Sequence, residues 1–181
     1  MDEYIMFMIV FIYGIIFGSF LNVCIYRIPE GSSIAIGKSH CMNCNKGIKW
    51  YDLVPVFSYI FLRGRCRYCK TKISIQYPII ELLNGFLYLL IFYLFGWTWI
   101  SIVYSFIASA LLVLSIIDFR TNTINLGINI FIFIMGIFVV VLKYSSTRDV
   151  SLIFNHIIGF FIVSGFLLLI VIVTGQRGMG L

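Results

Sequence analysis

Residues 82–117 run for 36 positions without a charged side chain, as LLNGFLYLLIFYLFGWTWISIVYSFIASALLVLSII. As a single helix this stretch would extend about 54 Å, far beyond the roughly 30 Å hydrocarbon core of a bilayer. It must therefore fold back on itself. The break is predicted at Gly96-Trp97-Thr98, where glycine interrupts the aliphatic run and tryptophan suits the headgroup level. The stretch thus predicts two membrane-spanning helices, one from about Gln76 to Phe95 and one that ends near Asp118.

Three more uncharged runs, residues 4–26, 121–142 and 150–174, are each long enough to cross a membrane. The 181-residue chain is 61% hydrophobic and 11% charged, with a mean hydropathy of +1.06. That composition excludes a water-soluble globule, and continuous apolar runs exclude the alternating pattern of a β-barrel. The first run begins with Asp2 and Glu3 and lacks a basic n-region, so it is expected to be retained rather than cleaved as a signal peptide. We predict an all-α polytopic membrane protein with about five transmembrane helices.

The orientation follows from the distribution of positive charge. Residues 27–75, between the first two predicted helices, hold nine of the thirteen Lys and Arg residues. The positive-inside rule places this loop in the cytoplasm and the amino terminus outside, and five spans then put eleven of the thirteen cations on the cytoplasmic side. The predicted organisation is a first helix over 1–26, a cytoplasmic loop over 27–75 and helices two to five over 76–181.

Four of the five cysteines form two Cys-x-x-Cys pairs, Cys41/Cys44 and Cys66/Cys69, with 21 residues between the pairs. Two such knuckles can close a tetrahedral Zn²⁺ site, and a reducing cytoplasm disfavours disulfides. Structural zinc is therefore favoured, with redox-active thiols and disulfides as the alternatives. A shell of four thiolates leaves no open position for a catalytic water, so zinc would stabilise the loop rather than catalyse a reaction. Cys24, inside the first helix, is expected to be a packing residue.

Few ionisable groups lie near the predicted spans. Glu81 is expected in the first turn of the second helix, where the helix dipole favours a carboxylate. Asp118 closes the third helix, where the dipole opposes a carboxylate, and this makes it a candidate functional residue unless Arg120 compensates. The basic loop is explained by topology and by contact with anionic lipid headgroups, so membrane lipid is an expected partner and nucleic acid is not.

Several stretches, taken in order, match one family. They are Gly18-Ser19-Phe20-Leu21-Asn22-Val23 with Arg27-Ile28-Pro29, the segments Trp50-Tyr51-Asp52-Leu53-Val54-Pro55-Val56 and Ser58-Tyr59 inside the double knuckle, Leu62-Arg63-Gly64-Arg65-Cys66-Arg67-Tyr68-Cys69, and Ser74 with Tyr77-Pro78-Ile79-Ile80-Glu81-Leu82. Together they resemble bacterial type IV prepilin leader peptidases, which are membrane aspartic proteases. The resemblance is dense over residues 10–95, although Gln76 stands where an arginine is common.

The resemblance implies a bifunctional enzyme of the bacterial plasma membrane. Its substrates would be prepilin or pseudopilin precursors, cleaved after a glycine at the end of a basic leader. The new amino terminus would then be N-methylated from S-adenosylmethionine. Proteolysis in the family uses two aspartates at the cytoplasmic membrane boundary, and Asp118, in Ile116-Ile117-Asp118, occupies the place of the first.

The chain departs from the family pattern at two places. Ile124-Asn125-Leu126 stands where the family usually has isoleucine-proline-aspartate, so a stiffening proline and a carboxylate are both lost. The final residues, Arg177-Gly178-Met179-Gly180-Leu181, resemble the approach to the family's Gly-x-Gly-Asp turn and stop before its aspartate. We therefore expect a partial peptidase domain with the second catalytic aspartate absent, and Glu81 is not expected to replace it. The alternative is a noncatalytic zinc-loop membrane scaffold that binds pilin-like helices.

Overall fold

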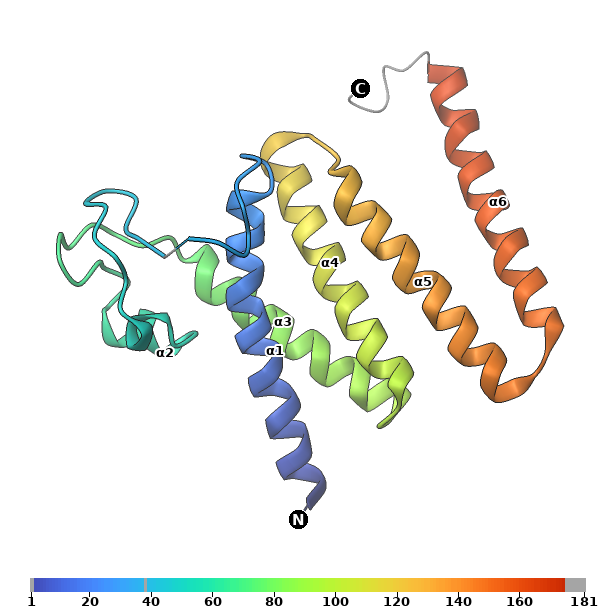
Figure 1. Ribbon diagram of the computed structural model, residues 1–181, viewed down its shortest axis with the longest axis horizontal. Coiled ribbons are helices and arrows are strands. Elements are labelled where there is room, and N and C mark those ends of the chain that lie inside the picture. Colours follow the sequence, from blue (N-terminus) through green and yellow to red (C-terminus); the bar gives the residue numbers. More distant parts are fainter. Residues whose placement is uncertain (1, 38, 175–181) are drawn as a thin grey trace.

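The computed structural model describes residues 2–37 and 39–174 of the chain, and its regular elements there are helical. These elements are α1 (Asp2–Arg27), the 3₁₀ helix η1 (Trp50–Leu53), α2 (Phe57–Phe61), α3 (Gln76–Phe95), α4 (Trp99–Thr121), α5 (Leu126–Thr147) and α6 (Val150–Thr174). Within these ranges, α1, α3, α4 and α5 are long and apolar enough to cross a membrane, and 150–166 is a shorter apolar segment of α6. Figure 1 shows α1 crossed obliquely by α3, with α4 and α5 following on the other side and the cysteine-rich loop to one side of α1. The predicted all-α polytopic fold is confirmed.

The turn between α3 and α4 lies at the predicted break. Gly96 ends α3 with a φ of +69°, a left-handed conformation that glycine adopts without steric cost. Thr98 then caps α4, because its hydroxyl oxygen accepts a hydrogen bond from the Ser101 N–H at 3.2 Å. The uncharged residues 82–117 therefore form a helical hairpin.

The next connection differs from the expected boundaries. α4 continues for three residues beyond Asp118 to Thr121, and Asn122 ends it in the left-handed conformation. α5 begins at Leu126, after the start of the uncharged run at residue 121, because Asn125 Oδ1 accepts a hydrogen bond from the Ile128 N–H at 3.1 Å. Asn125, which stands at the proline position of the family pattern, therefore serves as a helix cap.

α1 and α3 pack at unusually close range. A Cβ added to Gly14 would lie 2.7 Å from the Cα of Gly85, and a Cβ added to Gly18 would lie 2.6 Å from the Cα of Glu81. These separations leave no room for any side chain on α1 at either position. Gly14 and Gly18 thus form a Gly-x-x-x-Gly contact of the kind that lets membrane helices approach through their backbones.

Polar side chains join three of the helices inside the apolar bundle. Asn84 of α3 is fully buried and donates from Nδ2 to the carbonyl oxygen of Gly14 in α1, at 2.7 Å. Its Oδ1 accepts a hydrogen bond from Ser109 of α4 at 2.8 Å, and the same hydroxyl lies 3.2 Å from the Tyr88 hydroxyl. Hydrogen bonds of this type between membrane helices each stabilise by about 0.6 kcal/mol on average.

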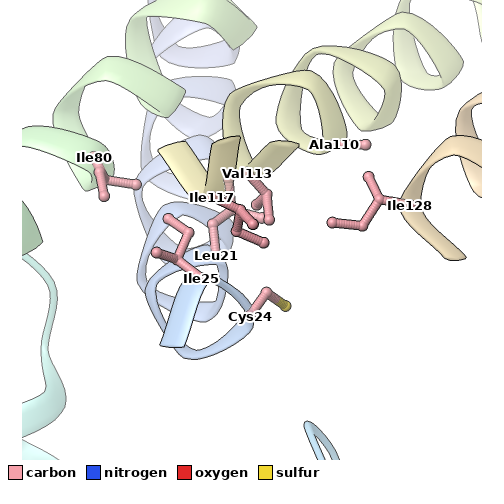
Figure 2. Close-up of a cluster of buried hydrophobic side chains, with 8 residues drawn as sticks. All are labelled: Leu21, Cys24, Ile25, Ile80, Ala110, Val113, Ile117 and Ile128. Atoms are coloured by element: carbon pink, nitrogen blue, oxygen red, sulfur yellow. The ribbon is translucent and has the colours of Figure 1, made fainter. Parts of the chain in front are cut away.

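A hydrophobic cluster continues this contact toward the loop-side end of the bundle (Figure 2). Its members come from α1, α3, α4 and α5, and are Leu21, Cys24, Ile25, Ile80, Ala110, Val113, Ile117 and Ile128. Cys24 is buried among them, which confirms its predicted role in packing. The cluster holds the last turns of α1 and α4 and the first turns of α3 and α5 together.

We expect Gly18→Ala to destabilise the bundle by about 1–3 kcal/mol, because the new methyl group would force the backbones of α1 and α3 apart. The measurement is the midpoint of thermal unfolding in detergent. Gly136→Ala in α5 is the matched control, since a Cβ there meets no atom within 4 Å in the described structure. Equal melting temperatures for the two variants would contradict the close-contact account.

Candidate metal centre and membrane-edge site

The two cysteine pairs adopt the same backbone conformation. In the first knuckle the Cys41 N–H donates to the Lys46 carbonyl oxygen at 3.0 Å, and in the second the Cys66 N–H donates to the Thr71 carbonyl oxygen at 2.9 Å. The residue after each pair, Asn45 or Lys70, has a φ between +50° and +60°. Each knuckle is closed by an antiparallel bridge, His40 with Gly47 and Arg65 with Lys72. Each turn therefore directs the two sulfurs of its cysteine pair to the same side of the knuckle.

The four sulfurs converge on one point. The Sγ atoms of Cys41, Cys44, Cys66 and Cys69 all lie within 4.8 Å of one another, and those of Cys41 and Cys69 are 3.7 Å apart. A tetrahedral ion with Zn–S bonds of about 2.3 Å requires sulfurs about 3.8 Å apart. All five cysteines of the chain are free thiols in the structure, so no disulfide competes for these sulfurs. The cluster can hold a metal ion, and its donor set fits structural zinc.

Polar groups favour the thiolate form that a metal requires at two of the four sulfurs, those of Cys41 and Cys69. The Lys46 N–H lowers the pKa of the Cys44 thiol, but burial and the neighbouring thiols outweigh it and raise that pKa to about 11. The backbone N–H groups of Cys44 and Asn43 lower the pKa of the Cys41 thiol. The Thr71 hydroxyl, 3.3 Å from Cys69 Sγ, and its backbone N–H lower the pKa of the Cys69 thiol to about 5. The Asn43 side chain also donates to the Thr71 hydroxyl at 2.8 Å and joins the two knuckles. These contacts prepare the Cys41 and Cys69 sulfurs for a cation.

An ion pair fixes the segment between the knuckles. Arg67, in the second knuckle, donates to Asp52 of η1 through Nε at 2.8 Å and through a terminal nitrogen at 2.6 Å. The Asp52 side chain is only 6% exposed. Hydrogen bonding from the Arg67 guanidinium holds the pKa of the Asp52 carboxyl below its usual value. The bidentate geometry fixes orientation as well as distance, so η1 is held next to the four-cysteine cluster.

Glu81 connects the loop to the membrane helices. It is buried in the second turn of α3, so the expectation of a first-turn residue stabilised by the helix dipole was wrong. Its Oε2 accepts a hydrogen bond from the Val56 N–H at 2.7 Å. Val56, with a φ of +61°, is the centre of a γ-turn in which the Phe57 N–H donates to the Pro55 carbonyl oxygen. This conformation is strained for a β-branched residue, and the carboxylate contact stabilises it.

A cavity of about 650 Å³ lies between the end of α1, the start of α3 and the cysteine loop. Asn22 and Tyr26 of α1, Tyr77 and Glu81 of α3 and Tyr59 of the loop are among the residues that line it. Tyr26 and Tyr77 stack with their ring centroids 5.7 Å apart. The Asn22 Oδ1 is buried and has no hydrogen-bond partner in the described part of the chain. A ligand or water that donates a hydrogen bond would satisfy it.

Asp118 lies elsewhere, on the exposed side of the last turns of α4. Its neighbour Ile117 is buried in the core, so the rotation of about 100° per residue turns Asp118 outward. Arg120 does not form a salt bridge with it; the guanidinium lies 4.4 Å from the centroid of the Tyr26 ring. Asp118 does not line the cavity, whereas Glu81 does. The structure therefore does not bring the two carboxyl groups into one cavity.

The structure brings together the four predicted metal ligands and leaves Asp118 apart from them. The sequence analysis missed the Asp52–Arg67 pair and the role of Glu81 as a partner for a backbone N–H. The Gly14-x-x-x-Gly18 spacing was the signal that could have indicated the close contact between helices. Lys38 and the predicted approach to a glycine-rich turn at residues 177–181 lie outside the described residues.

Comparison with known proteins agrees with the resemblance to prepilin leader peptidases. Residues 12–95 match the model of the bacterial Peptidase A24 N-terminal domain. The chain is 41% identical over 108 residues to a prepilin leader peptidase/N-methyltransferase of Myxococcus xanthus, a match that covers 60% of this chain and 32% of that protein. Proteins of the same description from Neisseria gonorrhoeae and Klebsiella pneumoniae are each 36% identical, covering 60% and 66% of this chain and 46% and 55% of theirs. The chain thus spans between about a third and just over half of these relatives. No solved structure matches it.

We expect the purified chain to contain one zinc ion, and Cys44→Ser to lose it, because removal of one thiolate opens the tetrahedral shell. Metal analysis by mass spectrometry of the purified protein checks this. Cys24→Ala is the control, since that thiol is packed in the helical core and should leave the zinc content unchanged. Full zinc occupancy in Cys44→Ser would contradict the four-thiolate site.

We expect Asp52→Asn to loosen the segment between the knuckles, so that trypsin cleaves faster after Lys49 and Arg63 at neutral pH. The folded pKa of Asp52 is lowered, so its carboxylate stabilises the loop above its ordinary pKa of about 3.9. That contribution is lost as the pH falls through the lowered value, and hydrogen exchange of the loop in both proteins should converge there. Glu30→Gln, at an exposed residue, is the control. Unchanged cleavage of Asp52→Asn would exclude the ion pair as a support of the loop.

Proposed function

We propose that the chain takes part in cleaving the basic leader from prepilin-like precursors, because residues 12–95 match the model of the bacterial Peptidase A24 N-terminal domain. The observation that carries the proposal is the 36–41% identity to proteins described as prepilin leader peptidase/N-methyltransferase. The chain would lie in the bacterial plasma membrane with its cysteine loop in the cytoplasm, as its cation distribution favours.

Asp118 is the proposed catalytic carboxyl group. Its exposure at the loop-side end of α4 supports this role, because a water molecule and a peptide can reach it there. In an aspartic protease two neighbouring carboxyl groups share one proton, since both cannot ionise easily at short range. The ionised member takes a proton from water as the water attacks the peptide carbonyl, and the protonated member donates to the carbonyl oxygen. Glu81 is not proposed as the second member, because it is engaged with Val56 and lines a different surface.

N-methylation of the new amino terminus is proposed as the second activity, with S-adenosylmethionine as the methyl donor. A cavity of about 650 Å³ is within the usual range for a small-molecule site. Its unsatisfied Asn22 Oδ1 fits a ligand that carries N–H groups, and the Tyr26 and Tyr77 rings offer an aromatic surface. These residues would hold the donor and exclude water around it.

The zinc loop has a structural part in this proposal. The metal would hold the two knuckles together and so fix one wall of the cavity, since Cys41 and Cys66 both line it. A loop of this size has few buried apolar residues of its own, so metal binding would supply much of its folding free energy.

A noncatalytic scaffold that binds pilin-like helices is the second candidate function. The separation of Asp118 from Glu81 favours it, because aspartic chemistry needs two adjacent carboxyl groups. Incubation of the reconstituted 181-residue chain with a prepilin separates the two functions. A shortened product indicates an enzyme, and retention of the precursor without cleavage indicates the scaffold.

In a chain extended to the length of its relatives, we expect Asp118→Asn to reduce cleavage of a prepilin by at least about a thousandfold, the scale at which a catalytic group is lost. The measurement is the gel shift of the precursor in proteoliposomes, with zinc content as the test of folding. Asp149→Asn is the control, because that exposed carboxylate caps the start of α6 through Ser151. Undiminished cleavage by Asp118→Asn would remove the residue from the mechanism.

A further inference from the structure

The segment between the knuckles carries an exposed apolar surface. Its members are Trp50 and Leu53 of η1 and Phe57, Ile60 and Phe61 of α2, here called the aromatic patch. Of these five side chains, only Leu53 also lines the cavity. All five side chains are exposed, Trp50 by 80% and Phe61 by 83%. Exposed aromatic groups are expected on helices that cross a bilayer, but η1 and α2 are far too short to do so. A patch of this kind on a loop between helices indicates a binding surface.

The position of the patch along the bundle is fixed by one hydrogen bond. Val56 directly precedes α2, and its N–H donates to the carboxylate of Glu81, which is the sixth residue of α3. With a rise of 1.5 Å per residue, Glu81 lies about 7.5 Å along α3 from its first residue, and the residue before α2 is hydrogen-bonded to it there. In Figure 1, α2 lies alongside the length of α1, lower than the loop-side end of that helix. The patch therefore lies next to the start of a helix that is long and apolar enough to cross a membrane, within reach of lipid.

The charges around the patch suit a lipid surface. Exposed cations flank η1 and α2 on both sides, with Lys49 before η1 and Arg63 and Arg65 after α2. The Asp52–Arg67 pair neutralises the acidic group nearest to the patch. Aromatic side chains bordered by Lys and Arg are typical of short elements that lie in the membrane interface.

We propose that the aromatic patch inserts into the headgroup layer of the membrane that the helices span, on anionic phospholipid. η1 and α2 thereby form an interfacial anchor that holds the cysteine loop against the bilayer. Lipid would contact the side chains of η1 and α2, while the Glu81–Val56 hydrogen bond holds the backbone of the same segment. The Asp52–Arg67 pair joins η1 to the second knuckle. This inference does not depend on the proposed function.

The test uses the whole chain in lipid nanodiscs, with Trp97→Phe and Trp99→Phe so that Trp50 is the single tryptophan. Its fluorescence is measured in phosphatidylcholine–phosphatidylglycerol discs, with and without bromine on the acyl chains, and with iodide in the water. We expect brominated lipid to quench Trp50 and iodide to leave it largely unaffected. Quenching by iodide without quenching by brominated lipid would overturn the proposal. Protection from both quenchers would also overturn it, since a second copy or another protein would then cover the patch.

A matched pair of variants keeps the result specific. Phe57→Ser/Ile60→Ser/Phe61→Ser should abolish quenching by brominated lipid and make Trp50 accessible to iodide. Ile34→Ser/Ile36→Ser removes exposed apolar side chains elsewhere in the same loop and should change neither signal. Zinc content in each protein reports whether the loop has folded. If the triple variant keeps its zinc and its lipid quenching, these side chains do not insert and the proposal fails.

Discussion

The rest of the structure depends on the close backbone contact between α1 and α3. Gly14 and Gly18 let the two helices approach until their Cα atoms are nearly in contact, and Asn84 then spans the interface to reach the Gly14 carbonyl oxygen. Lipid chains are as apolar as leucine, so membrane helices gain little from burying aliphatic surface and rely on close packing and hydrogen bonds. The contact also sets where Glu81 lies, and through Glu81 it sets where the segment before α2 is held against α3.

The cysteine loop is held in place both by contacts between its own residues and by a contact with α3. Its two knuckles have equivalent turns and direct four sulfurs to one point, but the segment between them lacks a hydrophobic core. The Asp52–Arg67 pair supports that segment from within the loop, and Glu81 of α3 supports it from outside by accepting the Val56 N–H. In our proposal the aromatic patch adds a contact with lipid. A small domain with so little core of its own generally needs supports of this kind, and metal binding would contribute folding free energy.

The two carboxyl groups near the membrane boundary have opposite environments, and this separates their roles. Glu81 is buried and its oxygen is used by a backbone N–H, so it serves the architecture of the loop. Asp118 directly follows the buried Ile117 of α4, yet the helical rotation directs it away from the core, so its side chain is exposed. An exposed carboxyl group at a membrane edge suits acid–base chemistry. A carboxylate that is buried and already hydrogen-bonded suits a structural role, here holding the loop in place.

The sequence by itself determined the class of fold, the hairpin at Gly96 and the four cysteines that can hold a metal ion. It could do so because hydropathy, glycine and Cys-x-x-Cys turns act through local chain geometry, which a linear pattern records. It did not determine the start of α5, the burial of Glu81, the Asp52–Arg67 pair or the separation of Asp118 from Glu81. Those features depend on which residues from distant segments meet, and on the rotation of each helix about its axis. Only the tertiary packing of α1 against α3 and α4 decided them, because that packing selects the face that each helix buries.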